Sequence, residues 1–322
     1  MLEILSSIVL AFHLMCMNVA SAGPLVCAWL DWRSGRGDDV AHRAAKFLAW
    51  KSLVLLVAGG LFGLLVAAFF WNDDYHDLMH VFIYKIKWGA WELLFSLAIM
   101  VVYAAMIARG APRSWASKLG RASLAVLTGT NLLYHFPALF IVISEVAAGY
   151  IDMPQTVDAA IFRSLMTESS VLARSVHFWL ASFAVTGVSL IGYGKWLLRQ
   201  KEEQEAGEKI ATWGGRIALV PTVLQVLVGV WVVSVLPPLM QQRLMGRDLV
   251  VASAFGLSIV GALWLMHQLS AVAFGDTKPR TLKLAIHLMY IVVILMTLTS
   301  RLALARSIHP ETVTNLKAFD DD

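Results

Sequence analysis

Eight long apolar stretches, separated by short polar segments, run along the chain. They cover roughly residues 4–30, 47–71, 88–108, 122–149, 171–198, 217–237, 249–274 and 284–305. A helix needs about 20 apolar residues to cross a bilayer. The pattern therefore predicts an all-α polytopic membrane bundle of about eight transmembrane helices. Val157, Ile161 and Leu165 are spaced by four residues, so segment 156–170 is expected to form an amphipathic surface helix. Segment 200–208 is expected to be a charged loop.

Basic residues are shared unequally between the two sets of alternating polar segments. One set, which includes the segments after the first, third, fifth and seventh stretches, holds 17 Lys and Arg, and the other holds nine. Because Lys and Arg accumulate in cytoplasmic loops, we expect both termini to lie outside.

Composition agrees with a membrane protein. Of 322 residues, 58% are hydrophobic and 15% are charged, against about 25% charged in soluble domains. An ordinary soluble enzyme and a disordered chain are excluded. The net charge of +4 resides in loops, so we expect membrane lipid and no nucleic acid as a partner. We expect one membrane domain, 1–322.

Seven histidine and glutamate residues fall inside the apolar stretches. They are His13, Glu92, His135, Glu145, His177, His267 and His287. Such groups are costly in hydrocarbon and are functional candidates. A neutral imidazole can bind haem iron, whereas the alternative is a histidine hydrogen-bonded between helices. Five histidines on five helices favour haem binding.

Depth distinguishes the histidines. Counting from the helix ends places His13 and His177 in the outer half and His135 near the midplane. His267 and His287 lie at matching depth on neighbouring antiparallel helices, so they could ligate one haem or hydrogen-bond to each other. Glu92, about one turn inside the outer face, suits a proton path or a haem-propionate neighbour. Its alternative is pairing with nearby Lys87 or a tryptophan.

The segment Ala173–Gly187 contains His177 followed by Ala-Ser and Val-Thr-Gly. It resembles the start of the fifth helix in the large subunit (subunit I) of cytochrome bd quinol oxidases. Phe12-His13 is similar to the first helix of that family, Trp91-Glu92-Leu93 to the third and Thr130-Asn131-Leu132 to the fourth. The resemblance covers roughly residues 5–240, and residues 241–322 diverge. The chain is shortened and lacks the family's long quinol loop and its Gly-Arg-Gln-Pro-Trp oxygen-site signature.

The resemblance implies one or two b haems, with His13 and His177 as iron ligands. His80, His135 or a methionine would be the second ligand opposite His177, and Glu92 would lie on a proton route. The implied function is electron transfer in the bacterial inner membrane, between a membrane quinol and a redox partner such as a cytochrome c or a second membrane subunit. Without the signature, reduction of oxygen to water is not expected. The residues alone also permit a proton or ion transporter, or a non-catalytic membrane anchor.

Overall fold

Eight long helices form the body of the protein in a computed structural model that describes residues 2–152, 154 and 156–308. They are α1 (Leu2–Ser34), α2 (Asp39–Phe70), α4 (Ile83–Ala108), α5 (Trp115–Ala147), α7 (Ser169–Leu197), α8 (Gln204–Ser234), α10 (Leu249–Ala273) and α11 (Pro279–Ile308). All eight are long and apolar enough to span a membrane. The prediction of an all-α, multi-pass membrane bundle is confirmed, and no strand occurs in the described ranges.

Short helices lie between the long ones. They are α3 (Asp73–Val81), α6 (Ala159–Met166), α9 (Pro238–Gln242), the 3₁₀ turn η1 (Lys201–Glu203) and the π-type turn η2 (Arg243–Arg247). The expected surface helix is confirmed as α6, and its N-cap Asp158 accepts hydrogen bonds from two backbone amides. The loop expected at 200–208 is wrong, because α8 begins at Gln204. Acidic residues in a first turn favour a helix start, and Glu205 supplies one.

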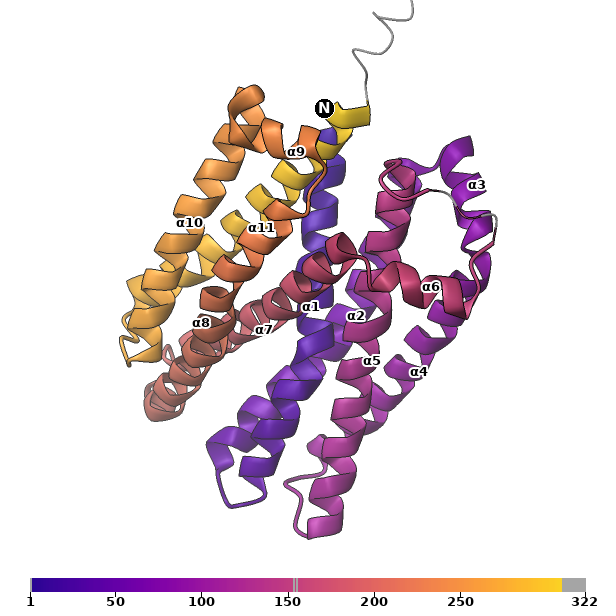
Figure 1. The fold of residues 1–322 in the computed structure, drawn as a ribbon. Coiled ribbons are helices and arrows are strands. Elements are labelled where there is room, and N and C mark those ends of the chain that lie inside the picture. The colour runs from indigo at the N-terminus through magenta and orange to yellow at the C-terminus, as the bar shows by residue number, and fades with distance from the viewer. Residues whose placement is uncertain (1, 153, 155, 309–322) are drawn as a thin grey trace, which may run out of the picture.

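The helices pack around α1, which contacts α2, α5, α7 and α11 (Figure 1). Helix α7 packs along α8, α8 contacts α10, and α10 pairs with α11. Helices α3 and α6 lie at the same end of the bundle, beside α4 and α5 (Figure 1). We call this the α3–α6 end.

Glycines bring α7 and α8 into backbone contact. A Cβ added at Gly187 would lie 2.5 Å from the Gly214 carbonyl oxygen, and one at Gly194 would lie 2.6 Å from that of Gly207. These four glycines pair in antiparallel order, so they fix the register of the two helices.

Two ion pairs with buried carboxylates join α5 to its neighbours. Arg121 Nη1 lies 3.4 Å from Asp31 Oδ1 on α1, and Arg174 Nη1 on α7 lies 3.3 Å from Glu145 Oε1. Arg121 is one of the 17 basic residues expected in polar segments between the crossings, but it is buried inside α5. Its guanidinium also donates to the carbonyls of Gly110 and Met106 at the end of α4. These partners compensate for its loss of hydration.

Asp38 connects three helices at the opposite end of the bundle. Its carboxylate caps α2 by accepting from the Ala41 amide, and it pairs with Arg33 at 2.9 Å and Lys209 at 3.2 Å. Partial burial alone would raise the pKa of Asp38, but the hydrogen bonds from Arg33, the Ala41 amide and Lys209 together lower it.

Candidate functional site

His13 and His177 lie at the same depth. Ser182 Oγ on α7 donates to Asn18 Oδ1 on α1 at 2.9 Å. Each bonded residue follows its histidine by five positions. Because α1 and α7 are the first and fifth crossings, they run in the same direction. Both imidazoles therefore lie about 7.5 Å along the helix from this bond, on the same side of it.

His135 shares that depth. Trp179, two residues after His177, donates from Nε1 to the carbonyl of Leu133, two residues before His135, at 2.7 Å. Helices α5 and α7 run in opposite directions, so the two histidines are level. His135 was expected nearer the midplane than His177, and this contact corrects that expectation.

Three further groups complete what we call the polar layer. Gly59 O on α2 lies 2.7 Å from His13 Nδ1, Glu92 Oε2 on α4 lies 3.4 Å from His135 Nδ1, and Gln225 Nε2 on α8 lies 3.4 Å from His177 Nε2. The polar layer thus consists of His13, Gly59, Glu92, His135, His177 and Gln225. It draws on six helices, and the structure brings together four of the residues predicted from sequence.

His13 has the arrangement of a metal-binding histidine. Its Nδ1 is bonded to the Gly59 carbonyl, so Nδ1 carries the hydrogen and Nε2 keeps a lone pair. Iron- and zinc-binding histidines are oriented by the same kind of second bond. Gly63 makes room for the ring, since a Cβ there would lie 2.9 Å from His13 Cε1. A Cβ at Gly59 would instead lie 2.7 Å from Met17 Sδ, so Gly59 lets α1 approach α2 closely.

His177 has a buried ring nitrogen without a protein partner. Its Nδ1 is shielded from solvent and makes no hydrogen bond to any residue in the described ranges. An unpaired buried polar group is costly. The donor chemistry of His13 therefore fits a haem b iron, which needs only one or two imidazole ligands. His177 fits it when the Gln225 amide presents its oxygen to Nε2–H, which leaves the lone pair on Nδ1. No cluster of three or more metal-binding side chains is found among the described residues.

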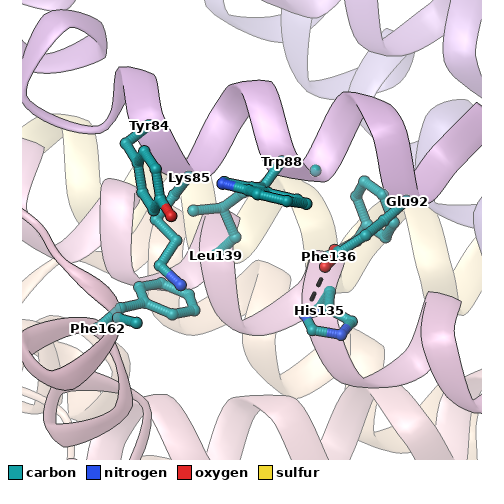
Figure 2. Close-up of a pocket in the computed structure, with 10 residues that line it drawn as sticks. Tyr84, Lys85, Trp88, Glu92, His135, Phe136, Leu139 and Phe162 are labelled. Carbon is teal, nitrogen blue, oxygen red and sulfur yellow. Dashed lines mark ion pairs between the residues drawn. The ribbon is translucent and has the colours of Figure 1, made fainter.

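A cavity of about 170 Å³ adjoins Glu92 and His135. Figure 2 shows Trp88, Phe136 and Phe162 around it, with the Glu92–His135 pair at one end and Tyr84 and Lys85 at the other. Lys85 Nζ lies 4.7 Å above the Phe162 ring. Asn131 supports the pair from behind, since its amide donates to Ser96 Oγ and to the Glu92 carbonyl. His13 and His177 do not line this cavity.

His267 and His287 lie outside the polar layer. Ser258 Oγ donates to Met296 Sδ between α10 and α11 at 3.3 Å, nine residues from each histidine, so the two are at matching depth as expected. Both are exposed on the surface of the bundle. His287 Nδ1 is within 2.7 Å of the carbonyl of Lys283 in its own helix. Their role as haem ligands stays a prediction.

Other predicted candidates have structural partners. Glu145 is 2% exposed and accepts a hydrogen bond from Ser170 besides its pair with Arg174. His80 lies on α3, with its Nε2 3.2 Å from Nε2 of His76. The sequence analysis missed Gln225 and the glycines beside His13. A lone amide within the apolar stretch 217–237 was the available signal for Gln225.

The comparison with solved structures indicates a fold. The chain is similar to the bd oxidase from Geobacillus thermodenitrificans, with a TM-score of 0.72 and 12% sequence identity over 94% of this chain and 85% of that one. No protein-family model and no curated protein matches the chain. At this identity the likeness shows the fold, which is that of a bd oxidase chain.

Proposed function

We propose that this chain is a haem b-binding subunit of a quinol-linked oxidoreductase in the bacterial inner membrane. It would exchange electrons between a membrane quinol and a redox partner, such as a cytochrome c or a second membrane subunit. The observation that carries the proposal is the placement of His13 and His177. They lie level on two helices that run in the same direction. His177 Nδ1 has no protein partner among the described residues, and the bond from His13 Nδ1 to the Gly59 carbonyl leaves the lone pair on His13 Nε2. The bd oxidase fold supports it.

His13 and His177 would hold the iron of one or two b haems. When bound, haem supplies a one-electron carrier whose potential depends on its ligands and on burial. The Gly59 carbonyl fixes the ring of His13 through Nδ1 and leaves Nε2 as the nitrogen that would bind iron. Gln225 Nε2 lies 3.4 Å from His177 Nε2. With the Gln225 amide turned so that its oxygen accepts from Nε2–H, His177 would keep the Nδ1 lone pair for iron.

The cavity at Glu92 suits the ring of a quinol. An apolar cavity of about 150 Å³ holds a benzene molecule, and this one measures about 170 Å³. Phe136, Phe162 and Trp88 offer aromatic contacts to the ring. Oxidation of a quinol releases two electrons and two protons. The Glu92 carboxylate would accept one proton from a ring hydroxyl and pass it to His135 Nδ1, 3.4 Å away. The second proton would follow the same route once His135 has released the first, and the two electrons would pass one at a time to the b haem that His13 and His177 would hold.

The test is a reduced-minus-oxidised absorption spectrum of the full chain purified after expression with ample haem. We expect a b-type signal, which His13→Ala and His177→Ala each diminish while the protein stays monodisperse. The double variant His267→Ala/His287→Ala decides whether a second haem binds near α10 and α11. A flat spectrum refutes the proposal. Proton flux in vesicles that Glu92→Gln abolishes would then favour a transporter, and tolerance of all five histidine substitutions would favour a membrane anchor.

A further inference from the structure

An open groove of about 610 Å³ lies between α2 and α7, at the end of the bundle opposite the α3–α6 end. Its cations come from one stripe of α2: Arg43, Lys46 and Lys51 line it. Arg43 is paired with Glu203 at the start of α8. Lys46 and Lys51 are exposed, and neither has an ion-pair partner in the part of the chain that the structure describes. The groove thus carries two uncompensated positive charges.

Stacked aromatic rings form the wall of the groove. Phe47 on α2 stacks on Tyr193 of α7, with ring centres 4.1 Å apart and planes within 4°, and Tyr193 stacks on Trp196 at 5.8 Å. Trp196 and Trp50 remain 53% and 47% exposed. Tryptophan and tyrosine side chains favour the headgroup level of a bilayer. This end of the groove therefore lies where lipid headgroups are.

An apolar track continues from the groove along α2. The track consists of five exposed aliphatic residues that follow one another at helical spacing: Val54, Val57, Leu61, Leu64 and Leu65. From Val54 to Leu65 the track is about 16 Å long at the rise of an α-helix. That length is about half of the 30 Å hydrocarbon core, which is the depth of one acyl chain.

We propose that this groove binds an anionic phospholipid. Its phosphate would lie between Lys46 and Lys51, its glycerol region against Trp50 and Trp196, and an acyl chain along the apolar track of α2. Two unpaired lysines favour a lipid with net negative charge over a zwitterionic one, whose ammonium group they repel. The site is independent of haem and of the proposed electron transfer, because none of its residues belongs to the polar layer.

The experiment measures lipid retention by native mass spectrometry of the full-length chain, released from nanodiscs of equal parts phosphatidylglycerol and phosphatidylethanolamine. We expect selective retention of phosphatidylglycerol. The variant Lys46→Gln/Lys51→Gln should weaken it about 30-fold, from the usual contribution of a lysine near an anionic surface. The matched control Arg199→Gln/Lys201→Gln removes two exposed charges at the same end, outside the groove, and should retain the selectivity.

Two further measurements identify the occupant. Free glycerol phosphate at millimolar concentration should not displace the lipid, and displacement would mean that the groove binds phosphate alone. A photocrosslinking residue at position 196 should capture lipid in intact membranes, whereas capture of a protein subunit overturns the proposal. Equal retention by the Lys46→Gln/Lys51→Gln variant and the control also overturns it.

Discussion

Replacing Gly63 by alanine should displace the His13 ring. A Cβ at this position would lie 2.9 Å from His13 Cε1 and 3.2 Å from Nδ1, whereas carbon atoms in contact normally lie about 3.5–4.0 Å apart. The ring must therefore retreat from α2 by roughly 0.6 Å or more. Because Gly59 is also on α2, this movement lengthens the 2.7 Å bond between Nδ1 and the Gly59 carbonyl.

The neighbouring Gly60 is a matched control. A Cβ at Gly60 meets nothing within 4 Å. Gly60→Ala should therefore raise the free energy of unfolding by roughly 0.5–1 kcal/mol, as is usual when alanine replaces a glycine inside a helix. Gly63→Ala gains the same term but loses a hydrogen bond of about 0.5–1.5 kcal/mol and incurs strain. We expect Gly63→Ala to be about 1–2 kcal/mol less stable than Gly60→Ala, the loss of the bond plus strain.

Both effects can be measured on the purified protein. Unfolding in detergent can be followed by the fluorescence of the 12 tryptophans, and haem content by absorption. We expect the lower midpoint and the weaker b-type signal in Gly63→Ala. If Gly63→Ala proves as stable as Gly60→Ala and its spectrum is unchanged, the glycines do not position His13.

Three other substitutions test the contacts between helices. The pKa of Asp38 is lowered in the fold, so its stabilisation is present above the unfolded value of about 3.9 and is lost as the pH falls through the lower native pKa. Asp38→Asn should therefore cost about 1 kcal/mol at pH 7 and less once the pH is below the native pKa of Asp38, as seen by thermal unfolding against pH. Glu208→Gln, an exposed acidic residue beyond the first turn of α8, should change neither. Arg174→Gln leaves the carboxylate of Glu145 buried without its cation and should cost about 3–5 kcal/mol. The measurement is a urea titration of each variant. Arg163→Gln, exposed on α6, should be neutral in it, and recovery in Glu145→Gln/Arg174→Gln would identify the unpaired charge as the cause. Gly187→Ala should loosen α7 from α8, since its Cβ would lie 2.5 Å from a backbone oxygen, whereas Gly192→Ala has open space. Equal proteolysis of these two variants would contradict the close-packing argument.

The sequence predicted the number of spanning helices and their order, because hydropathy measures what a bilayer requires of a helix. It predicted the helix ends less well. Helix α8 extends from Gln204 and α5 from Trp115, well before the apolar stretches begin. Their first turns are polar, and polar residues form helices readily while contributing nothing to a hydropathy pattern.

The polar layer could be predicted only in part. The histidines and Glu92 stand out because ionisable residues are rare in apolar stretches. Their common depth depends on contacts between distant segments, such as Asn18 with Ser182 and Leu133 with Trp179. The role of Gly63 could not be predicted from the sequence. A glycine in a membrane helix makes room for a neighbouring side chain, and that neighbour is known only from the packing of α2 against α1.

The pair of Asp31 and Arg121 has a consequence for biosynthesis. The ribosome adds Arg121 90 residues after Asp31, which takes about 5–20 s at usual elongation rates. Until α5 is inserted, the aspartate at the end of α1 has no guanidinium and must stay hydrated at the membrane surface. Helix α1 can therefore adopt its final position only after α5, the fourth crossing, has been inserted. The helices of this half of the protein must assemble in that order.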